Sequence, residues 1–414
     1  MRDVLFTGVM MILSRFYKGE NRNVRPKKIG LVLAGGGARA AYQVGVLKGI
    51  AELEPVGVSN PFPIISGTSA GAINGAALAI YAPHFQGAVR RLCSVWENFH
   101  VSHVFRSDPL GMLQNSSLWM LAMLLGGLGK HNPQALLNRQ PLYELLAQRL
   151  PCERIQKSID GGFVEAFGVS CSGYTSGQSV TFFQGQEDIQ PWHRVRRVGT
   201  RSVITTEHLM ASSALPFIFR PEKIHREFYG DGSMRQMAPL SPALHMGAER
   251  LLVIGVRLDN SKQPERVEDA VMPSVAQVGG HALNSIFLDS LDADLERLHR
   301  INKTVDLIPR RKGSETPLRR IESLVISPSR HLSDVAEEYA ELLPKSVAFF
   351  FRGIGVYKKD GSDFLSYLLF EREYCQALIE LGYRDAMAQR EDIISFLNDK
   401  DYTTPAEEAE DTDF

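Results

Sequence analysis

The strongest constraint on the fold is a pair of strand–turn–helix units near the start of the chain. Residues 28–34 (KIGLVLA) form an apolar β-like run that leads through three glycines into a helical pattern ending near Leu53. Residues 63–66 form a second short strand, which passes through Gly67 into the alanine-rich stretch Ala70–Ile80. Two such units in succession predict a parallel sheet, because neighbouring parallel strands need a crossover helix between them.

The sheet is expected to extend far beyond these two units. Further strands are predicted at Phe163–Ser172, Gln178–Gln184, Leu251–Val256 and Glu322–Ser327. Residues Leu283–Arg300 have a helical pattern, and helix-rich sequence follows the last strand up to about Leu397. We therefore predict an α/β domain over residues 28–330 and a helix-rich C-terminal extension over residues 331–402.

Length, charge and cysteine usage narrow the classes of function. The 414 residues allow a large α/β domain with an appendage, since single cores stop growing at roughly 250–300 residues. A formal net charge of −1 disfavours a nucleic-acid partner. The histidines form no HExxH or HxH group, so neither a metal nor a cofactor is predicted. The cysteines form no CxxC pair, which favours a reducing, cytoplasmic compartment; they are Cys93, Cys152, Cys171 and Cys375.

Two apolar segments are too short to cross a bilayer, which takes about 20 residues. Residues 5–17 project as an amphipathic helix within the basic N-terminal segment 1–27, a pattern that favours an anionic lipid surface. Packing of this helix on the protein's own core is the alternative, and both stay open. Residues Leu118–Gly129 are apolar on every side, and we favour burial over lipid contact.

The two ends of the chain complete this outline. No small-residue cleavage site precedes Arg15, so neither a cleavable signal peptide nor a transmembrane helix is predicted. The last stretch, residues 403–414, is acidic and is expected to be disordered.

The sequence Gly67-Thr68-Ser69-Ala70-Gly71 fits G-x-S-x-G, the nucleophile elbow. In this motif the serine lies on a tight strand-to-helix turn, and glycines avoid collisions with the neighbouring strand and helix. The start of the helix also supplies unpaired amides and a partial positive charge beside the nucleophile. A βα turn without chemistry is the alternative, but the strand and helix that the motif requires are both predicted here.

The glycines Gly35, Gly36 and Gly37 form a second strand-to-helix turn, which continues into Ala38 and Arg39. Backbone amides in such a turn can point at one oxygen atom and so form an oxyanion hole. A phosphate-binding loop is the alternative. It is the weaker one, because the chain has neither a Walker lysine nor a complete G-x-G-x-x-G pattern at this turn.

Four elements together resemble the patatin-like phospholipase family. They are the Gly35–Gly37 turn, the G-T-S-A-G motif, the run Ala211–Pro216 (ASSALP) and the pair Asp231-Gly232, in this order and at these separations. By motif the resemblance covers roughly residues 28–260. It implies a three-layer α/β/α fold with a mainly parallel central sheet.

The resemblance also implies roles for individual residues. Ser69 would attack an ester carbonyl, Asp231 would act first as base and then as acid, and the amides of the Gly35–Gly37 turn would hold the oxyanion. Supporting motif positions are Gly67, Gly71, Gly232 and Arg39, and for Arg39 we favour a structural role over contact with a headgroup. Ala40 departs from the pattern, because many relatives have glycine there.

This arrangement is a dyad without histidine. A Ser-His-Asp triad is the alternative, and His208 and His225 are the nearest histidines before Asp231. In α/β-hydrolases the histidine follows the acid in the chain, and His245 is a histidine that follows Asp231 here. We disfavour His245 because residues 242–248 have the pattern of a helix, where a surface position explains a histidine equally well.

The function expected from these features is hydrolysis of carboxylic esters in lipids, with phospholipid at a membrane surface as the favoured substrate and free fatty acid as product. A lysophospholipid, a neutral glyceride or a thioester would use the same chemistry. A catalytically silent lipid-binding or regulatory protein of the same fold is the alternative from another class. We expect a cytoplasmic protein with peripheral membrane association, and a homo-oligomer stays open.

Overall fold

The computed structural model describes residues 27–106, 135–257, 274–309, 318–344 and 362–398, with isolated residues at 272, 316 and 348. Three segments discussed above lie outside these ranges. They are the N-terminal segment 1–26, the apolar run Leu118–Gly129 and the acidic tail 403–414.

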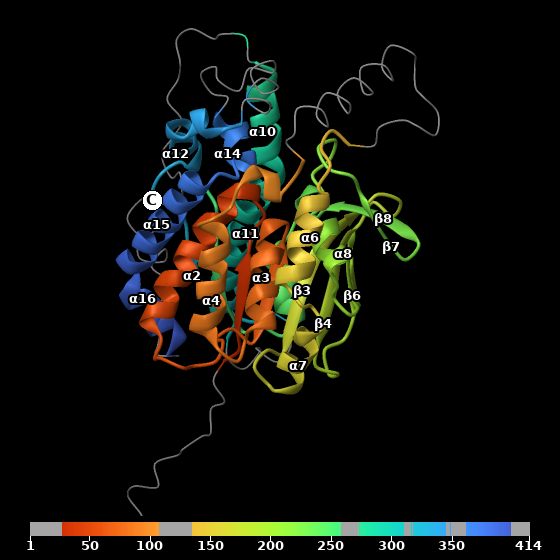
Figure 1. Cartoon of the computed structure of the whole chain (residues 1–414). Helices are drawn as coiled ribbons and strands as arrows, with labels where there is room; N and C mark the ends of the chain where they lie inside the picture. Colours follow the sequence, from red (N-terminus) through yellow and green to blue (C-terminus); the bar gives the residue numbers. More distant parts are fainter. Residues whose placement is uncertain are drawn as a thin grey trace, which may run out of the picture.

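Within the described residues, a ten-stranded mixed sheet forms the centre of the molecule (Figure 1). The main strand order is β10-β9-β1-β2-β3-β4-β6-β5, and β8 pairs with both β3 and β7. The strands are β1 Ile29–Leu33, β2 Ile64–Thr68, β3 Ala166–Gly173, β4 Ser179–Gly185, β5 Trp192–Arg194, β6 Arg197–Arg201, β7 Glu222–Ile224, β8 Glu227–Asp231, β9 Arg250–Ile254 and β10 Glu322–Ile326. All pairs from β10 to β3 are parallel. The prediction of a mainly parallel sheet is confirmed.

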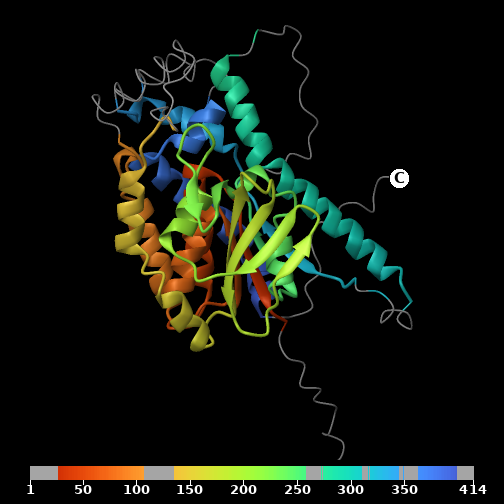
Figure 2. The ribbon, with the colours of Figure 1, turned by 90° about the vertical axis from the view of Figure 1, so that its right-hand side faces the viewer.

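Helices cover both faces of this sheet (Figures 1 and 2). One face carries α2 Ala41–Leu53, α3 Ala70–Ile80, α4 Phe85–Trp96 and α15 Arg372–Ala388, and the other carries α9 Ser241–His245 and α11 Asp289–Asp306. Successive side chains of β1 alternate between two buried clusters. Leu31 and Leu33 join the cluster under α2 and α3, whereas Val32 joins the cluster under α9 and α11. The predicted three-layer α/β/α arrangement is confirmed.

The register of β3 places two strand ends against each other. β2 ends at Thr68, opposite Ser170. β8 runs antiparallel to β3, and its last residue, Asp231, pairs with Cys171, the residue of β3 that follows Ser170. β4 already occupies the other edge of β3 as far as Ser172, so β8 lies on the edge where β2 ends. The carboxyl ends of β2 and β8 therefore meet.

The helix-rich C-terminal region is also confirmed, and it packs on the same core. It comprises α12 Leu332–Glu338, α14 Ser362–Leu368, α15 and α16 Arg390–Leu397. The Tyr42 hydroxyl of α2 donates to Asp385 of α15 at 3.0 Å. The fully buried Arg250 of β9 donates to the carbonyl of Phe396 at 2.7 Å and pairs with Glu322 at 2.8 Å. These contacts attach the C-terminal helices to the sheet.

Candidate active site

Ser69 lies in the sharp turn between β2 and α3, where its φ of 54° places a non-glycine residue in the left-handed region. The two glycines of the motif make this turn sterically feasible. A Cβ atom at Gly67 would lie 2.5 Å from Cα of Ala72, and one at Gly71 would overlap the carbonyl oxygen of Leu33. Backbone strain of this kind is typical of functional turns.

A buried serine holds the backbone of this turn. The Ser69 N–H donates to Oγ of Ser212 at 2.9 Å, and the Ser212 hydroxyl in turn donates to the carbonyl of Ser170 at 2.6 Å. Ser212 is fully buried near the end of α8 (Thr206–Ser212). Because Ser170 belongs to β3, this chain of two hydrogen bonds fixes the nucleophile turn to the central sheet.

Asp231 is the last residue of β8 and is completely buried. Its Oδ1 accepts the backbone N–H of Ser233 at 2.9 Å. Its Oδ2 forms no hydrogen bond of ordinary geometry within the described ranges, although the carboxylate lies close enough to the Ser69 hydroxyl for that group to lower its pKa. The next residue is constrained to glycine, because a Cβ atom at Gly232 would overlap the carbonyl oxygen of Ser170. One carboxylate oxygen is thus fixed by a backbone hydrogen bond, and the other can accept a proton.

The environment of Asp231 raises its basicity. Burial raises the pKa of this carboxyl group above its usual 3.8 to about 6, and its interaction with the Ser69 hydroxyl, the contacts of Ser233 and the charge of Arg139 oppose the rise. Above pH 6 the group is still ionised, and a carboxylate with this pKa accepts a proton more readily than an exposed one.

The glycine-rich turn lies beside this pair. Gly37 has a φ of 55°, and a Cβ atom there would overlap the carbonyl oxygen of Tyr367. A Cβ atom at Gly35 would lie 2.5 Å from Oγ of Ser233, which places the turn against the Asp231 loop. A short 3-10 helix, η1 (Gly37–Ala40), follows. The first amides of a helix have no partner within it.

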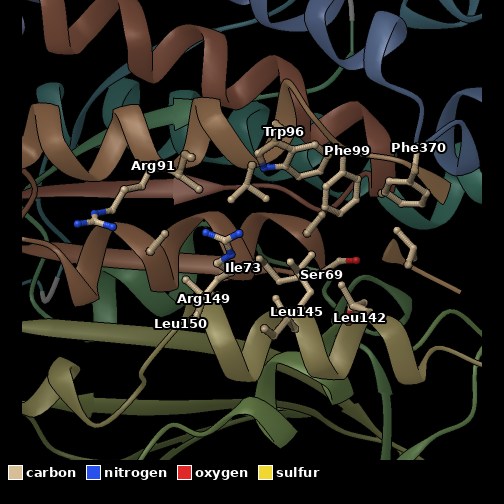
Figure 3. Close-up of a pocket in the computed structure, with 18 of the residues that line it drawn as sticks. Ser69, Ile73, Arg91, Trp96, Phe99, Leu142, Leu145, Arg149, Leu150 and Phe370 are labelled. Carbon is tan, nitrogen blue, oxygen red and sulfur yellow. The ribbon is translucent and has the colours of Figure 1, made fainter. Parts of the chain in front are cut away.

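An apolar cavity of about 330 Å³ opens from Ser69 and Gly37. It follows α3 and is bounded by α4 and by α6 (Gln140–Arg149) (Figure 3). Most of its lining is apolar, including Ile73, Trp96, Phe99, Leu142, Leu145 and Phe370. The site therefore joins a serine, a buried carboxylate and an apolar channel.

Comparison with known proteins decides the family. The model of the patatin-like phospholipase family matches residues 31–244, just over half of the chain. The chain belongs to the patatin-like phospholipase family. The matched range contains the glycine-rich turn, Ser69 and Asp231.

One curated relative points to the same class of enzyme. A segment of 58 residues is 52% identical to "Lysophospholipase nte1" of Aspergillus terreus (strain NIH 2624 / FGSC A1156). This segment is 14% of the present chain and 4% of that much longer protein. Together with the family match, the similarity supports a lipid hydrolase.

Among the described residues of this patatin-like domain, the three histidines considered for a triad show no hydrogen bond to Ser69 or Asp231. His208 pairs with Thr205 through Nδ1 and with Ser202 through Nε2, and burial lowers its pKa to about 4. His225 lies in the turn between β7 and β8, before the first residue of β8, whereas Asp231 is the last residue of that strand. His245 stacks on Trp192 with a centroid separation of 5.0 Å.

Arg39 is buried among protein partners. Its guanidinium donates to Ser366 at 2.7 Å and to Tyr367 at 3.1 Å, and it pairs with Asp363 at 3.1 Å. These partners all belong to α14, and Asn284 of α10 (Val275–Phe287) accepts a further bond at 3.3 Å. Arg39 therefore ties the glycine-rich turn to the C-terminal region.

Two residues of the patatin-like site have no assigned role in the sequence analysis. Ser212 belongs to the ASSALP motif, and this motif is the one sequence signal that could have drawn attention to it. Arg139 has no local pattern at all, yet its buried guanidinium donates to the carbonyls of Met210 and Arg220 and pairs with Glu222 at 2.9 Å. It thereby holds the end of α8 and lowers the pKa of Asp231 through its charge.

We expect Ser212→Ala to lower both stability and activity. The change leaves the Ser69 N–H and the Ser170 carbonyl buried without this partner, which typically costs about 1–3 kcal/mol of unfolding free energy. Urea denaturation and ester hydrolysis would measure both effects. Ser158→Ala is the matched control, because that buried hydroxyl makes only a 3.5 Å contact with the carbonyl of Ile80. Equal behaviour of the two variants would contradict a special role for Ser212.

Two further observations concern membranes and metals. Among the described residues, no helix combines the length and the apolar character needed to cross a membrane. In the same part of the chain, no group of three or more His, Cys, Asp or Glu side chains is arranged to hold a metal ion.

Proposed function

We propose that the protein hydrolyses carboxylic esters of phospholipids at a membrane surface, with Ser69 as nucleophile and Asp231 as its acid–base partner. The observation that carries this proposal is the meeting of β2 and β8 beside β3. It brings a completely buried carboxylate to the hydroxyl of a strained serine, at the start of an apolar cavity.

The first half of the reaction forms an acyl-enzyme. Oδ2 of Asp231 accepts the proton of the Ser69 hydroxyl while Oγ attacks the ester carbonyl carbon. The carbonyl oxygen becomes negatively charged in the tetrahedral intermediate. As this intermediate collapses, the C–O bond to the alcohol breaks, and Asp231 donates its proton to the departing oxygen.

The second half restores the enzyme. Asp231 accepts a proton from water, and the resulting nucleophile attacks the acyl carbonyl carbon. Collapse of the second tetrahedral intermediate breaks the bond to Ser69, whose oxygen takes the proton back from Asp231. Fatty acid is released. We assign the stabilisation of the oxyanion in both halves to the amides of the Gly35–Gly37 turn and the start of η1, because Gly37 lines the cavity together with Ser69 and the first amides of a helix have no partner within it.

The cavity supports this substrate class. Its apolar lining suits an acyl chain, and because Ser69 is part of that lining, an ester at the end of a bound chain would lie beside the nucleophile. The segment shared with a lysophospholipase supports a lysophospholipid as the second candidate substrate. Parallel assays on a diacyl and a monoacyl phospholipid would distinguish these two substrates.

A fluorophosphonate probe tests this function against a catalytically silent lipid-binding protein. The expected result is one covalent adduct, located on Ser69 by peptide mass spectrometry, because an activated serine attacks the phosphorus atom. Ser158→Ala should be labelled like the wild type. A wild-type protein that binds phospholipid vesicles but takes up no probe would overturn the hydrolase proposal.

The pKa of Asp231 predicts an acid limit to activity. Because catalysis requires the ionised carboxylate, kcat/KM should fall about tenfold for each pH unit below about pH 6. An ordinary exposed aspartate would give this limit two pH units lower, near 3.8. The measurement is kcat/KM for a soluble short-chain ester between pH 4 and pH 8. A rate independent of pH down to about 4 would contradict the role of Asp231.

A further inference from the structure

The part of the cavity remote from Ser69 is more polar than the rest of its lining (Figure 3). Three polar residues, Tyr81, Arg91 and Arg149, line the cavity on the side of Arg91, and Tyr81 contacts both arginine residues. Figure 3 shows Arg91 at the end opposite Ser69 and Phe370, with Arg149 between them. We call Tyr81, Arg91 and Arg149 the distal cluster.

The distal cluster is assembled by contacts among α3, α4 and α6. The guanidinium carbon of Arg91 lies 4.8 Å from the centre of the Tyr81 ring. The Tyr81 hydroxyl donates to the backbone carbonyl of Arg149 at 3.1 Å. Tyr81 is thus the common neighbour of both residues, because its ring contacts the guanidinium of Arg91 and its hydroxyl contacts the backbone of Arg149.

Both guanidinium groups lack an anionic partner in the part of the chain that the structure describes. The side chains of Arg91 and Arg149 are exposed, and no carboxylate forms an ion pair with either within those ranges. By contrast, the buried arginines of the described residues are each paired with a carboxylate; they are Arg39, Arg139 and Arg250. The guanidinium group of Arg91 lies at the end of an apolar channel, and that of Arg149 lines it nearer Ser69 (Figure 3). A guanidinium group in such a place is suited to bind a carboxylate, whose planar geometry matches its own.

The length of the cavity sets the kind of molecule that reaches both ends. Tyr81 follows the last residue of α3, and Ser69 precedes the first. At about 1.5 Å per residue they are roughly 18 Å apart along the helix. An extended aliphatic chain of about 14 carbon atoms spans that distance, given carbon–carbon bonds of about 1.5 Å and angles of about 111°.

We propose that Arg91 and Arg149 form an anion subsite that binds the carboxylate at the far end of a long aliphatic chain lying in the cavity. The inference extends the proposed hydrolase, because the other end of the chain lies at Ser69. One source of such a carboxylate is an acyl group with a second, terminal carboxyl group. The other is a free fatty acid bound in reverse, with its tail toward Ser69, where it blocks the nucleophile.

The first arm of the test detects the terminal carboxyl group during catalysis. Wild-type enzyme is given the 4-nitrophenyl monoester of tetradecanedioic acid and, separately, the same ester with its free carboxyl group methylated. We expect kcat/KM to be up to roughly fivefold higher for the free acid, the upper end of the effect of an exposed charge pair. In the double variant Arg91→Gln, Arg149→Gln this ratio should fall to about one. Because a ratio is compared, general damage to the enzyme cancels.

The second arm needs no turnover. Binding of tetradecanoate and of methyl tetradecanoate to Ser69→Ala protein is measured by calorimetry, with and without the two arginine substitutions. We expect up to roughly fivefold tighter binding of the acid, and loss of that preference when both arginines are replaced. Arg90→Gln is the matched control in both arms, because Arg90 is an exposed neighbour on α4 that does not line the cavity.

The outcomes separate the two sources. A preference in the first arm alone identifies the terminal carboxyl group of an acyl chain, and one in the second arm alone identifies the released fatty acid. A preference that is absent from both arms, or that survives in the double variant, overturns the subsite. If neither ester is hydrolysed while arginine-dependent binding persists, the proposed hydrolase fails and the subsite stands.

Discussion

Replacement of Ser69 by alanine is expected to lower kcat for ester hydrolysis by about 10⁴-fold or more, because removal of a catalytic nucleophile typically has this effect. The loss should not come from unfolding. The hydrogen bond to Ser212 uses the backbone N–H of residue 69, and alanine retains that donor. Initial rates on a soluble ester and urea denaturation of the same preparation would measure activity and stability together.

The control for this variant is Ser158→Ala, which removes a buried hydroxyl from α7 (Arg154–Asp160). Its rate should match that of the wild type. If Ser69→Ala keeps more than a few per cent of the wild-type rate, the nucleophile is another residue. If it loses activity and also unfolds at a much lower urea concentration, the result reports structure rather than chemistry, and labelling of Ser69 by a fluorophosphonate decides the assignment.

Asp231→Asn should be nearly as damaging, with kcat lowered by about 10³- to 10⁴-fold, because the amide cannot accept the proton of the Ser69 hydroxyl. The same change should stabilise the folded protein at neutral pH. Burial raises the pKa of Asp231 to about 6, so the ionised carboxylate destabilises the folded state above that pH. Loss of activity with gain of stability would separate a catalytic role from a structural one.

The sign of the stability effect follows from proton binding. Between pH 3.8 and about 6 the folded protein binds a proton at Asp231 that the unfolded chain releases. The destabilisation is therefore fully present above about pH 6 and disappears as the pH falls toward 3.8. We expect the free energy of unfolding of Asp231→Asn to exceed that of the wild type by about 1–3 kcal/mol at pH 8 and by less at pH 4. A variant that is less stable than wild type at pH 8 would contradict this account.

Much of the fold was accessible from sequence because local patterns determine it. The parallel sheet followed from two glycine turns between strands and helices, and the structure places those turns at the ends of β1 and β2. One predicted helix, Leu283–Arg300, is instead divided at Leu288 into α10 and α11. Asp289 and Asp292 lie in the first turn of α11, where the helix dipole favours acidic side chains.

The site was only partly accessible, because its parts meet through long-range pairing. Ser69 has a local signature, but its proximity to Asp231 depends on the register of β8 against β3, which an Asp-Gly pair does not reveal. Arg139 and Ser212 act through buried hydrogen bonds to segments distant in the chain. Arg91 and Arg149 are ordinary surface arginines in the sequence, and only the packing of α4 and α6 beside α3 brings them to one cavity.

The most direct test of the central claim is the initial rate of fatty-acid release from phospholipid vesicles, compared between wild-type protein and Ser69→Ala at equal concentration. The account predicts rapid release by the wild type and, in the variant, a rate indistinguishable from that of vesicles alone. Equal release by the two proteins, or no release by a wild-type preparation whose Ser69 is labelled by a fluorophosphonate, would contradict the assignment of Ser69 as the nucleophile of a phospholipid hydrolase.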